Sequence, residues 1–196
     1  MEKNIDGIIT RNIQEDAQNL VTYYFENKQQ MDRELLKHIR NLCNSFRKKK
    51  QIVTGINFCI IRNGIYTGEY RVDIYLYYKN KENSTVTLDK EEWNTSEFMK
   101  FYEAKRECIK KELHETMPFI QIHKVRECEL RYGYKSLFNV VQVIEQNVLN
   151  ILEIIKMHLK LESTFYVTYN YAGSKQIILY EEKEEDNGEI LRNFYE

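Results

Sequence analysis

The spacing of the apolar residues changes along this chain, and the change is the strongest constraint on its fold. Before residue 51 the apolar residues recur every three or four positions, whereas from Gln51 to Tyr78 they alternate with other residues. The first spacing is typical of amphipathic helices and the second of strands with one buried face. A chain of 196 residues is long enough to bury a core around both kinds of element. We therefore predict a single α+β domain over residues 1–196.

The same spacing predicts where the elements lie. Helices are expected over residues 10–27, 31–50, 95–117 and 136–161, and Pro118 is expected to end the third. Strands are expected over residues 52–60, 70–78, 85–88, 119–124, 126–132, 164–170 and 175–182, with a glycine turn at Gly64 and Gly68. The predicted order is one helix followed by three helix-strand-strand units. Antiparallel sheets with helices packed on one face are the expected architecture.

Charge and composition limit the binding partners and the cellular compartment that we expect for the protein. Lys and Arg number 29 against 30 Asp and Glu, so no global charge attracts the chain to nucleic acid or a membrane. The first residues are acidic and lack an apolar run, and the helix at 136–161 is interrupted by charges, so we expect a cytoplasmic protein. The four cysteines form no CxxC pair and are expected to be reduced. The acidic segment 183–196 is expected to fray.

Catalytic and metal-binding patterns are incomplete. Gly64-Ile65-Tyr66 matches the first tripeptide of one nuclease class, but the second tripeptide, Tyr-Ile-Gly, does not follow. Another nuclease pattern would combine Asp73 with Glu181–Lys183, far apart in the sequence. A metal site would have to gather residues that show no known zinc spacing: His114, His123, Cys128 and Glu129. We predict no enzyme, no metal and no cofactor; a hydrolase or nuclease whose site is assembled only in space stays an alternative.

A protein-binding surface is the more distinctive prediction. The strand at 70–78 places Arg71, Asp73, Tyr75 and Tyr77 on the face opposite its apolar residues. Tyrosines give rigid, amphipathic contact area of the kind that interfaces favour. An acidic stretch near the C-terminus is a second candidate surface, because it suits a basic groove on a target: Glu181, Glu182, Glu184, Glu185 and Asp186.

Two further interpretations stay open. The helix at 31–50 carries Arg33 and Lys37 and ends in a basic cluster, so it is the candidate for nucleic-acid binding, through Arg40, Arg47, Lys48, Lys49 and Lys50. The helix at 136–161 is apolar over more than one stripe. It is either the buried central helix of the domain or packs its second side against another copy in a homodimer.

Residues 56–134 carry a further pattern: a hairpin that ends in the aromatic run Tyr77-Tyr78-Lys79, the step Glu91-Glu92-Trp93, a long amphipathic helix and a second predicted hairpin. In this order they resemble the YezG-type immunity proteins of bacterial toxin systems. The N-terminal helix and the C-terminal helix-strand-strand unit depart from that family. The resemblance implies a cytoplasmic protein that neutralises a toxin by binding it.

The leading hypothesis is therefore a non-enzymatic inhibitor that covers a partner macromolecule, of the immunity or anti-defence kind. Residues with AT-rich codons, such as Ile, Lys, Asn and Tyr, are abundant. This composition indicates an AT-rich genome, as in many low-GC bacteria, their phages and plasmids, and a mobile element or a phage is the origin we expect.

Overall fold

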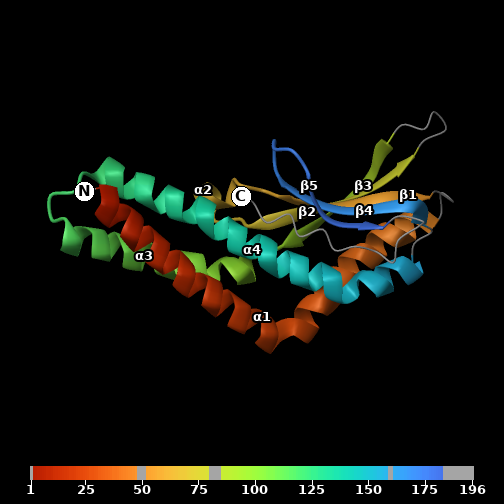
Figure 1. Cartoon of the computed structure of the whole chain (residues 1–196), viewed down its shortest axis with the longest axis horizontal. Coiled ribbons are helices and arrows are strands. Elements are labelled where there is room, and N and C mark those ends of the chain that lie inside the picture. Colours follow the sequence, from red (N-terminus) through yellow and green to blue (C-terminus); the bar gives the residue numbers. More distant parts are fainter. Residues whose placement is uncertain (1, 48–51, 80–84, 159–160, 183–196) are drawn as a thin grey trace. The chain divides into compact units, whose positions relative to one another are not determined.

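The computed structural model describes residues 2–47, 52–79, 85–158 and 161–182. Its elements follow the order α1 (Glu2–Arg47), β1 (Val53–Ile60), α2 (Gly64–Thr67), β2 (Arg71–Lys79), β3 (Thr85–Asn94), α3 (Ser96–Thr116), α4 (Ile122–His158), β4 (Leu161–Tyr171) and β5 (Ile177–Glu182) (Figure 1). The fold is α+β, as the sequence predicts. Within the described residues, none of the helices combines the length and the apolar character that crossing a bilayer requires.

The five strands form one mixed sheet in the order β3-β2-β1-β4-β5. The pairs β1–β2, β2–β3 and β4–β5 are antiparallel, whereas β1 and β4 run parallel. The prediction of a purely antiparallel arrangement is therefore wrong. Two long helices, α3 and α4, connect β3 to β4 and return the chain beside β1 in the direction of β1. Parallel neighbours need a long crossover of this kind.

The N-terminal segment is one helix, α1, and not the predicted pair of helices over 10–27 and 31–50. The residues between the predicted helices, Lys28, Gln29 and Gln30, are good helix formers. Gly and Pro are the strongest helix breakers, and the sequence has neither at these positions. The apolar stripe of each predicted helix is present in α1, since Leu20, Tyr24, Met31 and Leu35 are all buried.

The strands predicted at 119–124 and 126–132 are also absent, because α4 begins at Ile122. Val125, Cys128 and Tyr132 are buried at spacings of three and four, which is the spacing of a helix. The predicted order of helix-strand-strand units fails at this point. The strand predicted at 85–88 extends through β3 to Asn94, and Trp93 is buried on it. The two strands predicted near the C-terminus are present as β4 and β5.

The predicted glycine turn is a short helix, α2, between two antiparallel strands. Gly68 has a φ of 77° and donates its N–H to the carbonyl of Gly64, so it ends α2 in the left-handed conformation that glycine favours. A side chain at Gly64 would lie 2.6 Å from a ring atom of Tyr70. The Gly-Ile-Tyr tripeptide therefore serves a tight turn.

The contacts within the chain divide it into two compact units. We call Met1–Lys28, Asn63–Tyr70 and Thr95–Ile144 the helical unit. We call Gln29–Arg62, Arg71–Asn94 and Glu145–Glu196 the sheet unit. Both α1 and α4 run through both units. The prediction of a single domain concerns cooperative folding, and it stays a prediction that unfolding experiments can test.

The helical unit packs α3 antiparallel to the first part of α4. Tyr102 and Tyr132 stack at 5.4 Å between ring centroids, and the ring of Tyr70 meets Tyr102 edge-on at 5.9 Å. These three tyrosines are buried. The first part of α1 is held by ion pairs to α3 and α4, namely Arg11–Glu112, Lys105–Glu15 and Arg131–Asp6. These three tyrosines therefore belong to the core of the helical unit.

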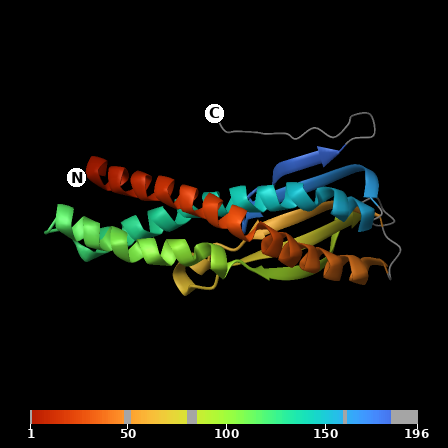
Figure 2. The same ribbon diagram turned by 90° about the horizontal axis from the view of Figure 1, so that it is seen from below.

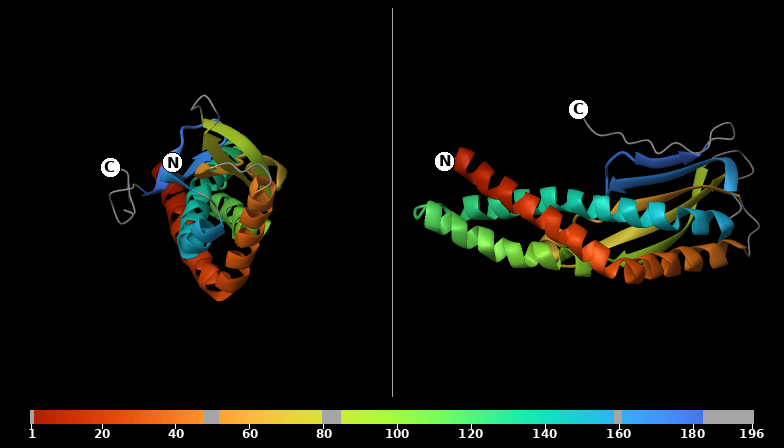
Figure 3. Two further views of the ribbon diagram at one scale, coloured as in Figure 1. Left: turned by 90° about the vertical axis from the view of Figure 1, so that its right-hand side faces the viewer. Right: turned by 60° about the horizontal axis from the view of Figure 1, so that its bottom comes forward.

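In the sheet unit, the second part of α1 and the last part of α4 lie on the same face of the sheet (Figures 2 and 3). His38 of α1 lies 3.0 Å from the carboxylate of Glu91 on β3. Lys156 of α4 lies 2.9 Å from the carboxylate of Glu182 on β5. This face carries the apolar core side chains of the central strands: Ile56, Phe58, Ile60, Val72, Ile74, Leu76, Phe165 and Val167.

Candidate binding face of the sheet

None of the described helices of the sheet unit covers the opposite face of the sheet, which we call the open face. Residues paired across neighbouring strands point to the same side. One row on this face consists of Lys90 on β3, Tyr75 on β2, Asn57 on β1 and Thr168 on β4. The next row consists of Tyr77 on β2, Gly55 on β1, Tyr166 on β4 and Glu181 on β5. The open face therefore combines tyrosines with polar and charged groups.

Asp73 is the centre of a charged network on the open face. Its carboxylate is buried and lies 3.3 Å from Arg71 Nε and 3.3 Å from Lys90 Nζ. The hydroxyl of Tyr75 donates to the same carboxylate at 3.4 Å. Glu92 completes the network through Lys90, at 2.7 Å. Arg71, Asp73 and Tyr75 thus lie together, where the period of the strand predicts them.

Beside these side chains, on the same face, lies a hydrogen-bonded polar cluster. Asn57 donates its side-chain amide to Asn170 Oδ1 at 2.9 Å, and Thr168 donates its hydroxyl to Asn57 Oδ1 at 2.9 Å. Asn57 and Thr168 are buried. Buried polar groups that have partners hold one arrangement of side chains. The hydrogen bonds therefore fix the arrangement of these polar side chains on the open face.

Tyr77 is held from across the sheet. Gln176, which precedes β5, donates its side-chain amide to the hydroxyl of Tyr77 on β2 at 2.8 Å. Burial raises the pKa of Tyr77, and burial together with the charge of Asp73 raises the pKa of Tyr75. Both phenols are therefore neutral at physiological pH. They offer ring faces and hydroxyl groups to a ligand.

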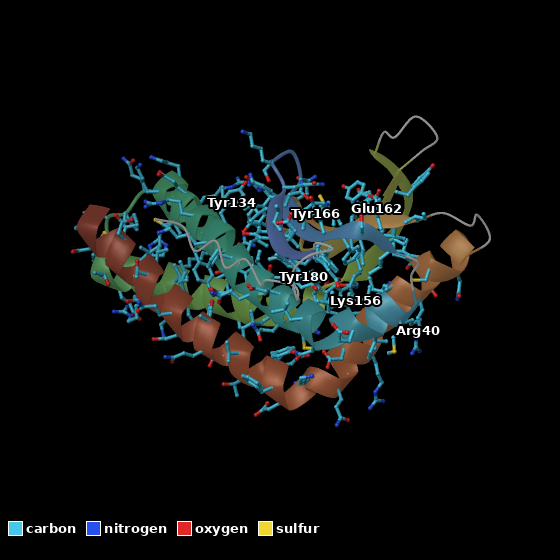
Figure 4. The ribbon with its side chains drawn as sticks, turned by 45° about the vertical axis from the view of Figure 1, so that its right-hand side comes forward. Arg40, Tyr134, Lys156, Glu162, Tyr166 and Tyr180 are labelled. Atoms are coloured by element: carbon cyan, nitrogen blue, oxygen red, sulfur yellow. The ribbon has the colours of Figure 1, made fainter. Side chains whose placement is uncertain are left out.

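A cavity of about 570 Å³ opens on this face. Strand β4 contributes every second residue to its wall, namely Glu162, Thr164, Tyr166 and Thr168, and Figure 4 labels Glu162 and Tyr166. The remaining lining comes from β1, β2 and the β5 region: Thr54, Gly55, Tyr77, Gln176 and Ile178. The volume lies within the range of small-molecule pockets, roughly 300–1,000 Å³.

Gly55 shapes the floor of this cavity. A Cβ atom at Gly55 would lie 2.9 Å from the carbonyl oxygen of Tyr166 on β4. The pairing of β1 with both of its neighbours shifts between Val53 and Gly55, which marks a bulge at Thr54. Bulges redirect side chains, and here both Thr54 and Gly55 line the cavity.

The predicted acidic surface is divided by the structure. Glu181 pairs with Tyr166 in the strand register and lies on the open face. Glu182 instead pairs with Phe165 and lies on the helix-covered face, where Lys156 contacts its carboxylate. Glu184, Glu185 and Asp186 lie outside the described residues.

The basic residues of α1 form an exposed stripe. Arg33, Lys37 and Arg40 are exposed at spacings of four and three, opposite the buried Leu35 and Ile39 (Figure 4 labels Arg40). Arg47 is the last residue of α1, and its side chain lies outside the described set, as do Lys48, Lys49 and Lys50. The described part of the candidate nucleic-acid surface is therefore a stripe of three basic side chains.

The residues weighed for catalysis or metal binding do not form a metal-binding group. Among the described residues, no three His, Cys, Asp or Glu side chains are placed to hold an ion. His114 and His123 are exposed, Cys128 is buried, and Glu129 lies 3.3 Å from Arg106. Burial raises the pKa of the Cys59 and Cys128 thiols, which disfavours the nucleophilic thiolate.

The cavity itself was not anticipated from the sequence. One local signal for it exists, because Glu162, Thr164, Tyr166 and Thr168 alternate with buried residues and must share a face. The parallel pairing that brings this face beside Tyr77 and Gly55 has no local signal. Comparison with protein-family models, with curated protein sequences and with solved structures gives no match.

Proposed function

We propose that this chain is a non-enzymatic binding protein that inhibits a partner protein by covering part of the partner's surface with the open face. An immunity or anti-defence protein from a mobile element or phage is the class that fits best, and the resemblance to YezG-type immunity proteins supports it. A toxin or a defence nuclease is the corresponding partner.

The observation that carries this proposal is the preorganised set of partly exposed tyrosines on the open face. Tyr75 is held by Asp73, Tyr77 is held by Gln176, and Tyr166 stands beside them across Gly55. Tyrosine buries a large area for little loss of side-chain entropy, because it has few rotatable bonds. Side chains that are already ordered before binding lower the entropy that association loses.

The test is partner capture with matched tyrosine variants. The tagged protein is used to purify its partner from the native host, and mass spectrometry identifies what is retained. We expect the double substitution Tyr75→Ser and Tyr166→Ser to abolish retention. Tyr66→Ser is the control, because Tyr66 is 56% exposed but belongs to the helical unit.

The captured partner is then produced separately and titrated by calorimetry against each variant. Circular dichroism confirms that the variants are folded. A partner that binds the double variant as tightly as the original chain would contradict the proposal, and so would a partner that is lost only with Tyr66→Ser.

A second candidate function is nucleic-acid binding through α1. The stripe of Arg33, Lys37 and Arg40 favours it, because three exposed cations on one helix face can neutralise phosphates of a nucleic-acid backbone. Polynucleotide binding should then fall steeply with salt, and replacing these three residues by Gln should flatten the dependence. Binding that is insensitive to both salt and these substitutions would exclude this function.

A further inference from the structure

Two tyrosines stand on either side of a glycine in the open-face cavity. Tyr77 on β2 and Tyr166 on β4 both pair with Gly55 on the strand between them, and both are half-buried. Their backbones are therefore two strand spacings apart, roughly 10 Å. A flat ring that contacts a second ring on each of its faces needs roughly 7–8 Å, twice the ordinary carbon–carbon contact distance. Because Gly55 has no side chain, the space between the two tyrosines can receive a planar ring.

One hydrogen bond reaches across the cavity. Gln176 donates its side-chain amide to the hydroxyl of Tyr77 at 2.8 Å, and both side chains line the cavity. Tyr77 is on β2 and Gln176 directly precedes β5, and in the sheet β1 and β4 lie between these two strands. The bond therefore holds the ring of Tyr77 in place before any ligand arrives. A wall that is ordered in advance lowers the entropy that binding loses.

The polar groups of the lining include both donors and acceptors. Tyr77 accepts a hydrogen bond from Gln176 and keeps its own O–H for donation. Thr168 donates its hydroxyl to Asn57 and keeps a lone pair that can accept. Thr164, on the same side of β4, adds a hydroxyl that can do either. A ligand that complements this lining carries donors and acceptors together on its edge.

We propose that the cavity binds a nucleobase, stacked on the ring of Tyr166 and hydrogen-bonded along its edge by Tyr77 and Thr168. A nucleobase is a flat ring whose edge combines donors and acceptors, and bases stack well on aromatic side chains. An indole ring is equally flat but has a single N–H on its edge, so it would leave most of the polar lining without a partner. This binding activity goes beyond the proposed function, because it requires no partner protein.

The experiment titrates the full chain with adenosine, guanosine, cytidine and uridine by calorimetry. NMR follows the side-chain signals of four lining residues: Thr164, Tyr166, Thr168 and Ile178. The matched probes are ribose, which has the sugar without the base, and N-acetyl-tryptophan amide, which has a flat ring without the edge of a base. We expect at least one nucleoside to give saturable shifts at these residues, the tryptophan probe to bind roughly tenfold more weakly, and ribose not to bind.

The source of the base is tested separately, because a free nucleoside or nucleotide and an unpaired base of a single strand share this chemistry. Adenosine monophosphate and a single-stranded pentanucleotide of the preferred base are compared with the nucleoside. Tighter binding of the pentanucleotide would identify a single strand as the source, and tighter binding of the nucleoside or nucleotide would identify the free molecule. Both results support a nucleobase site.

Variants locate the effect in the cavity. Tyr166→Leu should weaken nucleoside binding by about fivefold to a hundredfold, whereas Tyr166→Phe should bind as the original chain does because it keeps the ring. Tyr77→Phe loses the hydroxyl but keeps the ring, so it should narrow the difference between the nucleoside and the tryptophan probe. Tyr66→Leu is the control, because Tyr66 is 56% exposed and belongs to the helical unit. This control should leave nucleoside binding unchanged.

The inference is overturned if none of the nucleosides binds saturably, or if the tryptophan probe binds as tightly as the best nucleoside. If Tyr166→Leu does not fold, nuclear Overhauser effects between the base protons and the Tyr166 ring provide the second measurement in the original chain, and a bound nucleoside without them would also overturn it. The outcome is separable from the test of the proposed function. Partner capture that needs Tyr75 and Tyr166, in a chain that binds no nucleoside, would overturn this inference alone.

Discussion

Asp16, on α1 in the helical unit, is the residue with the most unusual surroundings. Its side chain is buried, and both of its carboxylate oxygens lack a hydrogen-bond donor among the described residues. Burial raises the pKa of Asp16 to about 7, against the opposing attraction of Lys105, and Glu15 adds to the rise. The folded protein therefore keeps this carboxyl protonated at pH values where the unfolded chain has lost the proton.

The pH dependence of stability follows from this shift. Below about pH 4 the carboxyl is protonated in both states, so it has no effect. Between about pH 4 and pH 7 only the unfolded state ionises, so the contribution of Asp16 to stability falls as pH rises and levels off above the folded pKa of about 7. We expect Asp16→Asn to be roughly 2–4 kcal/mol more stable than the original chain at pH 8, with little difference at pH 4. Urea denaturation across this range measures the difference, and a constant difference would contradict the prediction.

Gly133 gives a second prediction at the scale of single residues. A Cβ atom there would lie 2.7 Å from the Tyr102 hydroxyl and 2.9 Å from Ile65 Cγ2, inside the core of the helical unit. Gly133→Ala should therefore destabilise the protein by about 1–3 kcal/mol, although alanine is the better helix former. Gly7 is the control, because its Cβ would meet nothing within 4 Å. Gly7→Ala should stabilise the helix by up to about 1 kcal/mol in thermal or urea unfolding. A stabilising effect of both changes would show that the contact at Gly133 is absent.

The period-2 pattern was sufficient to predict which residues of β2 share the open face. Buried residues alternate with Arg71, Asp73, Tyr75 and Tyr77 along β2. Because side chains alternate between the two faces of a strand, these four residues must lie on the same face. The split between Glu181 and Glu182 follows from the same rule and could have been predicted. The contact between Gly55 and Tyr166 could not, because it joins residues on distant strands.

At the scale of elements, prediction failed where both periods fit the sequence. Between Phe119 and Tyr132 the apolar residues satisfy alternation as well as helical spacing, and only the burial of Val125, Cys128 and Tyr132 selects the helix. The parallel pairing of β1 with β4 is set by the path of α3 and α4 and not by any residue in either strand. Long crossovers of this kind leave no local pattern in the sequence.

The continuity of α1 is testable with a single proline. Gln30 lies in the exposed middle of the helix, within the segment that was predicted to separate two helices. Gln30→Pro removes a backbone hydrogen bond and clashes with the preceding turn, so it should destabilise the protein by about 3 kcal/mol or more. Gln30→Ala is the control and should change the free energy of unfolding by less than about 0.5 kcal/mol. Tolerance of proline at this position would restore the two-helix interpretation.

At the scale of the whole molecule, two compact units share two continuous helices. Each of α1 and α4 belongs to both units. If one unit unfolds, both helices are therefore cut short at the boundary between the units. A helix end created in this way exposes unsatisfied backbone groups and part of an apolar stripe. The open face belongs to the sheet unit, so it stays folded independently of the helical unit only if the two units unfold separately. This is the physical content of the single-domain prediction.

We expect one cooperative transition. Trp93 is the only tryptophan and is buried on β3 of the sheet unit, so its fluorescence reports that unit alone, whereas circular dichroism at 222 nm reports the helices of both. The two signals should give the same midpoint in urea. Gly133→Ala, which acts in the helical unit, should lower the Trp93 midpoint by the same amount as the dichroism midpoint. Gly7→Ala should raise both together. If the urea midpoint of Trp93 fluorescence is unchanged by Gly133→Ala, the two units unfold independently, and the chain then consists of two domains.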